Sequence, residues 1–212
     1  TSGLSLDNAT INAGTGNVIL KGQGTGAVQN FQIGTRLYGG SINGANITVD
    51  ALGSIQGASS SNWGLSLEGF SIEGSGNITL NGIGGRAGSS NSDANQVGVE
   101  IRRALDNLSD HSEVKATGTG TIIINGQGGS GTFADPAVTI PQATGIRIEA
   151  SQTNPIVSAN GNITLNGTSG RSGRGPALMI GSPVNSTNGN ISLKGNQSIE
   201  GTLNLNGNIE IN

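Results

Sequence analysis

The chain has 212 residues and a formal net charge of −3. Glycine contributes 38 residues, aromatic residues 2%, charged residues 11%, and cysteine none. This balance gives no basic surface for nucleic acid, and no stretch approaches the roughly 18 consecutive apolar residues of a membrane-spanning helix. The lack of cysteine argues against a disulfide-stapled domain and is compatible with a bacterial secreted protein.

A short motif recurs along the chain and predicts a repeated β-strand. Its clearest form, GNITLNG, occurs identically at residues 76–82 and 161–167. Each copy alternates apolar and polar positions, which is typical of a strand with one buried face. A unit this short cannot bury its apolar side alone, so its recurrence predicts that the copies stack. The seven aligned copies begin at Asn17, Asn46, Asn77, Thr121, Asn162, Asn190 and Asn208.

Two further strands are predicted between successive copies. The second strand has the pattern Gly, aliphatic or Thr, any residue, aliphatic. It occurs at residues 3–6, 34–37, 64–67, 98–101 and 145–148, with weaker forms at 177–180 and 201–205. The third is shorter, with one inward aliphatic residue. Its candidates are Ile11, Ile42, Ile72, Val114 and Ile156. Three short strands per turn predict an all-β fold. We expect residues 1–212 to form a single segment of right-handed parallel β-helix, with about seven rungs and loop insertions.

Asparagine and glycine punctuate the ends of each copy, and we expect them at the corners of the coil. Asparagine tolerates left-handed backbone angles, and stacked asparagines can form side-chain ladders along the axis. The glycines that follow each copy are expected to supply positive φ angles.

The connections between the first and second strands vary in length, so we expect their loops to stack along one edge of the rod. The loops carry Arg86, Phe133, Arg171 and Arg174 among many glycines and serines. Arginine and aromatic side chains could contact glycans or a partner protein, although variable solvent-exposed loops are the simpler interpretation. The most charged connection, residues 102–119, begins with a segment that could form one helical turn over 102–108.

The sequence contains little that indicates catalysis. The outward position of the second strand reads Ser5, Arg36, Ser66, Glu100, Arg147, Met179 and Asn204. In this register Glu100 and Arg147 lie on adjacent rungs, which predicts a solvated surface ion pair worth about 0–1 kcal/mol. His111, the only histidine, lies near Asp106, Asp110 and Glu113, where a metal or acid–base site is conceivable but a solvated histidine is the usual outcome. We therefore predict no catalytic residue, metal or cofactor.

The alternation of GNITLNG-type units with Gly-Val-x-Ile units resembles the repeat regions of large secreted bacterial surface proteins. These are the filamentous-haemagglutinin-like exoproteins and the β-strand-repeat adhesin-like proteins. The resemblance covers nearly the whole chain. It implies an extracellular, cell-surface β-helical stalk, adhesin segment or filament component, and it implies no catalytic or ligand-binding residue.

The sequence favours a non-enzymatic structural or adhesive segment. The chain begins at Thr1 without a signal peptide, which suggests a piece of a longer polypeptide. Its final strand, Ile209–Asn212, is expected to pair end to end with further β-helix or another copy. Host or matrix glycans and surface proteins are candidate partners. A carbohydrate-binding module using the loop edge is the alternative, and a carbohydrate-active β-helix enzyme dependent on Glu100 or His111 comes third.

Overall fold

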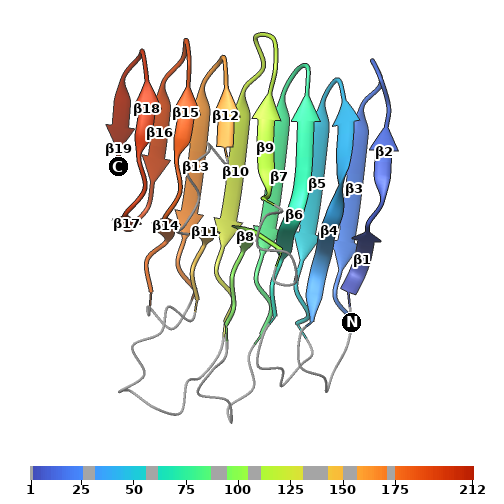
Figure 1. Ribbon diagram of the computed structural model, residues 1–212. Helices are drawn as coiled ribbons and strands as arrows, with labels where there is room; N and C mark the ends of the chain where they lie inside the picture. Colours follow the sequence, from blue (N-terminus) through green and yellow to red (C-terminus); the bar gives the residue numbers. More distant parts are fainter. Residues whose placement is uncertain are drawn as a thin grey trace.

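A computed structural model describes residues 2–25, 32–55, 62–86, 95–104, 111–130, 143–149, 157–170 and 175–212. All regular structure in these ranges is β, and no helix occurs in them. The strands form one sheet of twelve and one of seven, with parallel pairing. In Figure 1 the colours run in sequence order from one end of the row of strands to the other. The fold is therefore solenoid-like, as the recurring motif predicts.

The seven-stranded sheet consists of the copies of the first motif, stacked in chain order. Its strands are β3 (Val18–Gln23), β5 (Ile47–Leu52), β7 (Ile78–Ile83), β10 (Ile122–Gln127), β13 (Ile163–Thr168), β16 (Ile191–Lys194) and β19 (Ile209–Ile211). Their register is the one that the motif predicts, because the Cα partners of Ile122 are Ile78 on one side and Ile163 on the other. The first-strand prediction is confirmed at every copy.

The twelve-stranded sheet contains the predicted second and third strands as two adjacent rows. The second-strand row consists of β1 (Ser2–Asp7), β4 (Ile33–Gly44), β6 (Leu65–Gly74), β8 (Val99–Arg102), β11 (Ile146–Ile148), β14 (Leu178–Ile180) and β17 (Gln197–Ile199). The third-strand row adds β2 (Thr10–Asn12), β9 (Glu113–Ala116), β12 (Val157–Ala159), β15 (Val184–Ser186) and β18 (Leu203–Leu205). Strands β4 and β6 are long enough to pair in both rows.

One second-strand assignment and one third-strand assignment differ from the sequence prediction. Leu203–Leu205 belongs to the third row, where Leu203 is the Cα partner of Val184. The second-row position is held by β17, whose Gln-Ser-Ile sequence lacks the expected pattern, because only Gly195 and Asn196 separate it from β16. Val157 is the Cα partner of Val114, in the place expected for Ile156, which lies outside the described residues.

The core consists of aliphatic side chains stacked between the two sheets. Ile78, Ile122 and Ile163 of the seven-stranded sheet are completely buried. They belong to one continuous cluster with inward residues of the twelve-stranded sheet, such as Leu67, Ile101 and Ile148. The cluster also holds Phe70, the largest fully buried side chain. Burying one such side chain is worth about 1.5–3 kcal/mol, so the repeated stack accounts for the stability of a chain with few aromatic residues.

The glycine near the end of the first strand is required by close packing rather than by its backbone angles. Its φ is not positive in Gly22, Gly82 or Gly126, so that expectation was wrong for most copies, and it holds only for Gly195 at φ 116°. A Cβ on Gly82 would lie 2.1 Å from the carbonyl oxygen of Gly98, where the seven-stranded sheet approaches the second-strand row. A side chain does not fit at this position of the motif, because the backbone of the next strand row lies directly against it.

The corner asparagines form the predicted ladder along the axis. Each side-chain Oδ1 accepts a hydrogen bond from the backbone N–H of the corresponding residue in the next copy, as between Asn46 and Asn77 at 2.9 Å and between Asn162 and Asn190 at 2.8 Å. None of these asparagines has a positive φ; the single non-glycine example among the described residues is Asn8. Asparagine is therefore used here for its side-chain carbonyl.

The charged connection is only partly described. Residues 102–104 contain no helix, and the remainder of the expected helical turn lies outside the described residues.

We expect Gly126→Ala to lower the free energy of unfolding by about 1–3 kcal/mol, the usual cost of overpacking. Its Cβ would lie 2.2 Å from the carbonyl oxygen of Gly145. Thermal unfolding followed by circular dichroism measures the change. Ser192→Ala, on the outer face of the same sheet, is the control, and equal melting of G126A and wild type would contradict the packing argument.

The corner ladder gives a second prediction. Asn77 Oδ1 accepts from both the backbone N–H and the hydroxyl of Thr121, so Asn77→Ala should cost about 1 kcal/mol. Thr121→Asn restores the corner residue that the neighbouring copies use and should stabilise the chain by about 0.5–1 kcal/mol. Urea unfolding of both variants tests the ladder, which predicts effects of opposite sign.

Candidate functional site

The main concentration of charged side chains in the described part of the chain lies on the outer face of the second-strand row. Two outward columns run along this face. The first contains Ser5, Arg36, Ser66, Glu100, Arg147, Met179 and Ser198. Ser198 stands where Asn204 was expected, because β17 fills this row. The second column, two residues further along each strand, contains Asp7, Tyr38, Glu68 and Arg102.

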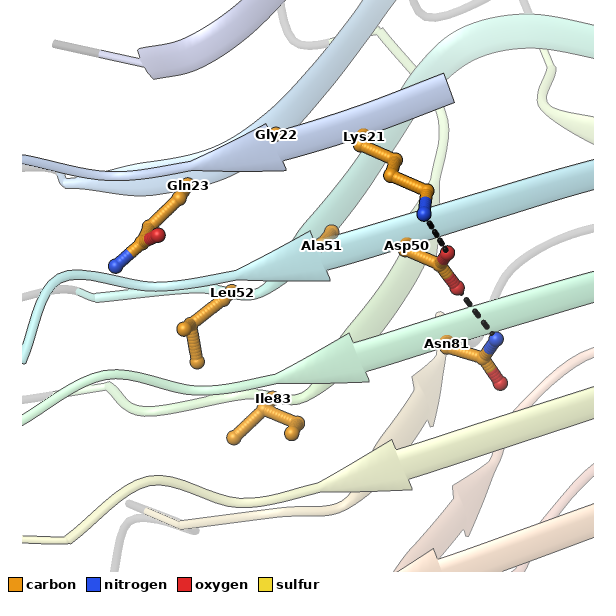
Figure 2. Close-up of a pocket in the computed structure, with 8 residues that line it drawn as sticks. All are labelled: Lys21, Gly22, Gln23, Asp50, Ala51, Leu52, Asn81 and Ile83. Carbon is orange, nitrogen blue, oxygen red and sulfur yellow. Dashed lines mark hydrogen bonds and ion pairs between the residues drawn. The ribbon is translucent and has the colours of Figure 1, made fainter. Parts of the chain in front are cut away.

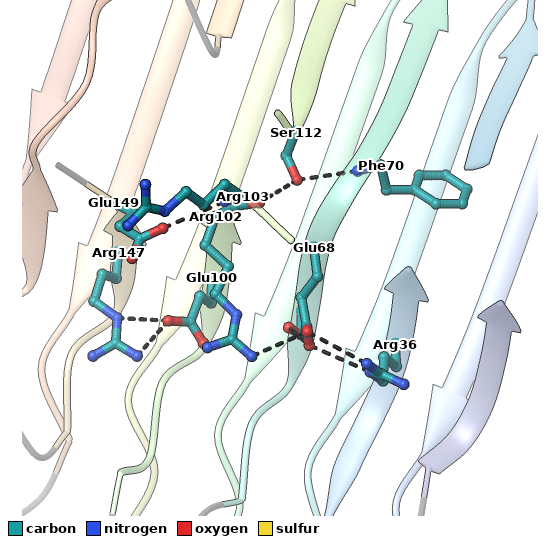
Figure 3. A network of polar contacts seen from close by, with 10 residues as sticks. Arg36, Glu68, Phe70, Glu100, Arg102, Arg103, Ser112, Arg147 and Glu149 are labelled. Atoms are coloured by element: carbon teal, nitrogen blue, oxygen red, sulfur yellow. Dashed lines mark hydrogen bonds and ion pairs between the residues drawn. The ribbon is translucent and has the colours of Figure 1, made fainter. Parts of the chain in front are cut away.

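Glu68 is held by two arginines from neighbouring strands. Its Oε1 lies 3.3 Å from Nε of Arg36, and its Oε2 lies 3.1 Å from Nη2 of Arg102. The hydroxyl of Ser66 donates to Oε1 at 2.9 Å. Figure 3 shows the carboxylate between the two guanidinium groups. Glu68 is only 2% exposed, so its charge is balanced by the two arginines and its oxygens also accept a hydrogen bond from Ser66.

Glu100 and Arg147 form the ion pair that the register predicts. Arg147 Nε donates to Glu100 Oε1 at 2.8 Å, and Arg147 Nη2 contacts the same oxygen (Figure 3). The expectation that this pair is solvated was wrong, because Glu100 is only 2% exposed. Two side chains from neighbouring segments border the cluster. The guanidinium of Arg102 lies 4.9 Å from the ring centroid of Trp63. The side-chain amide of Asn95 faces Arg147, and exchanging its oxygen and nitrogen lets the oxygen accept from Arg147 at 2.9 Å.

The pKa of Glu68 is lowered below its ordinary value of 4.5 by the balance of opposing effects. Burial alone raises this pKa. The hydrogen bond from Arg36, the positive charges of Arg102 and Arg36, and the hydrogen bond from Ser66 outweigh burial. Glu68 therefore remains ionised at neutral pH, where it serves as an ion-pair partner and cannot donate a proton as a general acid.

The remaining residues considered for catalysis are not assembled by the structure into a recognisable centre. His111 is exposed, and Asp106 and Asp110 lie outside the described residues. Glu113 lies in β9 opposite Ser71. Within the described ranges, no group of three or more histidine, cysteine, aspartate or glutamate residues is placed to hold a metal ion.

The outer face of the seven-stranded sheet carries a continuous amide ladder. Asn81 donates to Asp50, Asn125 to Asn81, and Asn166 to Asn125, each at 2.7 Å between nitrogen and oxygen. Lys21 Nζ lies 4.0 Å from Asp50 at the start of the ladder. Figure 2 shows this end beside a shallow pocket of ≈ 410 Å³ whose other walls are mainly backbone and apolar side chains. The amides bond to one another along the axis, so they serve the stacking of the strands.

The loop edge is described around Arg86. This arginine is exposed and forms an isolated parallel bridge with Ser130. A depression of ≈ 500 Å³ next to it includes the exposed side chains of Ile55 and Ile83. The other three residues expected at this edge, Phe133, Arg171 and Arg174, lie outside the described residues.

Sequence reasoning identified one pair of the charged cluster and missed the other members. Glu68 stands two residues after Ser66, at the next outward position of the same strand. Extending the outward column by one step would therefore have placed Glu68 beside Arg102. The sequence contains no comparable signal for the positions of Trp63 and Asn95 beside the cluster. Both residues lie in connections whose course the strand pattern does not specify.

In the described residues, no helix has the length and apolar character needed to cross a membrane. Comparisons of the chain with protein-family models, with curated proteins and with solved structures gave no match.

The lowered pKa of Glu68 predicts an acid-sensitive contribution to stability. A depressed folded-state pKa contributes stability above the unfolded value, and this contribution is lost as the pH falls through the folded value. Wild type should therefore lose unfolding free energy below about pH 4.5, the ordinary pKa of the group. Glu68→Gln should be about 1–3 kcal/mol less stable at pH 7, because it leaves the partly exposed guanidinium groups of Arg36 and Arg102 without their carboxylate partner.

Chemical unfolding of wild type and E68Q between pH 7 and pH 2 measures this effect. The difference between the two proteins should shrink as the pH falls, since protonation removes the same charge. Glu73→Gln, on the same strand β6, is the matched control and should follow the wild-type profile. A constant difference between wild type and E68Q across this range would contradict the assignment.

Proposed function

We propose that this chain is a right-handed parallel β-helix segment of about seven rungs, which serves as a non-enzymatic structural or adhesive element of a secreted bacterial surface protein. The observation that carries the proposal is the unbroken register of the first strand through β3, β5, β7, β10, β13, β16 and β19. Stacking of this kind yields a stiff rod with about 4.8 Å between successive strands. The right hand follows from the strong preference of parallel crossover connections.

The polar groups support a structural role. The amide ladder, the corner asparagines and the charged cluster all bond from one copy to the next, along the axis of the stack. A catalytic face would instead present carboxylates free to act on a substrate. Glu68 and Glu100 are engaged with Arg102 and Arg147. Extracellular location at the cell surface is part of the proposal, and it rests on the composition and on the repeat-region resemblance.

End-to-end pairing is the partner interaction that this function requires. Ile209 and Ile211, which occupy inward positions of β19, are 45% and 56% exposed, whereas their counterparts Ile191 and Leu193 in the preceding copy are completely buried. An open strand edge with exposed aliphatic side chains favours pairing with another strand. We propose that a further β-helical rung, from the same polypeptide or another copy, covers this edge.

Light scattering of the 212-residue segment across a range of concentrations tests end-to-end pairing. The apparent mass should rise with concentration, and small-angle scattering should show rods that lengthen without thickening. Ile211→Lys should suppress the rise, and Ile123→Lys, exposed on the side of the rod, is the matched control. A monodisperse monomer at high concentration would contradict the proposal that copies pair with one another.

A carbohydrate-binding module at the loop edge is the second candidate. The depression beside Arg86, with exposed Ile55 and Ile83, is the observation that favours it. Arginine and apolar side chains together suit the polar and C–H surfaces of a sugar. Loss of glycan binding on Arg86→Ala would support this site.

A further inference from the structure

A pocket of ≈ 370 Å³ lies on the outer face of the second-strand row, over β8, β11, β14 and β17. It adjoins the charged cluster, which contributes Glu100, Arg102 and Arg147 to its lining. The volume falls within the range of about 300–1,000 Å³ that is usual for ligand pockets. The pocket shares no lining residue with the depression beside Arg86.

The pocket exists because one outward position lacks a side chain. The backbone N–H of Gly181 donates to the carbonyl of Ile148 at 2.8 Å, and that of Glu200 donates to the carbonyl of Ile180 at 2.8 Å. These bonds place Gly181 between Glu149 and Glu200 in the second outward column. Glutamates on either side of a glycine leave a gap in this column, and Met179 and Ser198 border it in the first column.

Two of the side chains that line the pocket each contain a buried polar atom without a hydrogen-bond partner. Glu100 Oε2 and Arg102 Nε have no hydrogen-bond partner, although Glu100 is only 2% exposed and the Arg102 side chain 15%. Leaving a buried polar group unpaired costs about 1–3 kcal/mol. One of these atoms accepts and the other donates, so the wall of the pocket combines both kinds of polar group.

The charges of the residues that line the pocket argue against a simple anion or a metal ion as the ligand. Three carboxylates (Glu100, Glu149 and Glu200) face two guanidinium groups (Arg102 and Arg147), so the wall mixes acceptors with donors. An anion such as phosphate would meet the glutamates, and the described residues contain no cluster suited to a metal ion. The side chain of Met179 adds an apolar surface. A neutral polyhydroxylated molecule with a C–H face matches this combination.

We propose that this pocket binds one neutral sugar residue of a glycan. Its hydroxyls bond to Glu149, Glu200 and Ser198 and accept from the guanidinium groups of Arg102 and Arg147. Its C–H face packs on Met179. The proposal deepens the adhesive part of the proposed function by naming a ligand class and a site, and it does not depend on end-to-end pairing.

Binding to an array of neutral oligosaccharides of glucose, galactose, mannose and N-acetylglucosamine tests the proposal, followed by calorimetric titration with the strongest-binding oligosaccharide. Glu200→Gln removes an exposed rim carboxylate, and Gly181→Thr fills the gap at a position whose φ is not positive. Each should weaken binding by tenfold or more while the melting temperature stays near that of wild type. Glu210→Gln, on the seven-stranded sheet, is the matched control and should bind like wild type.

The possible outcomes separate the proposals. Weakening by E200Q and G181T, with Arg86→Ala unaffected, supports the pocket. Weakening by R86A alone overturns the pocket and favours the loop edge. Failure of the wild-type protein to bind any neutral oligosaccharide at millimolar concentration overturns the pocket as a sugar site and leaves the pairing of rods to be judged by light scattering.

Discussion

The structure depends on parallel, in-register pairing of equivalent residues in successive copies. Parallel hydrogen bonds are evenly spaced, so each position of one strand faces the same position of the next. Ile78, Ile122 and Ile163 therefore lie directly above one another, and all three are completely buried. A slip by one residue would turn every aliphatic side chain of a strand outward. The strictness of the apolar alternation follows from this constraint.

The same constraint governs the polar residues. Identical neutral amides stack favourably, since each amide both donates and accepts, and the ladder from Asn81 to Asn166 uses this property. Like charges stacked in this way would repel. The charged columns avoid such repulsion: Glu68 faces Arg102 directly, Glu100 faces Arg147, and Arg36 faces the neutral Ser66. Electrostatics therefore reinforces the register that the core establishes.

Recognition in such a molecule is expected where the regular pattern is interrupted. The glycine at position 181 breaks an outward column and leaves a pocket between two glutamates. The connections between first and second strands vary in length, and described residues at their beginnings line the depression beside Arg86. Both features lie outside the continuous cluster of inward aliphatic side chains. A single outward residue can therefore be exchanged at little cost to the fold.

The sequence by itself determined the strands of the first row and their register, because period-two alternation and the repeat are local properties of the chain. It also indicated the Glu100–Arg147 pair, since the register fixes which outward residues are neighbours. Only the tertiary structure decided features that depend on distant backbone. Gly82 is required by the close approach of Gly98 from another sheet. Leu203–Leu205 pairs in the third row because the connection after β16 is short and β17 already occupies the second row. The contacts of Trp63 with Arg102 and of Asn95 with Arg147 likewise depend on the tertiary structure, because both residues come from connections that carry no repeating pattern.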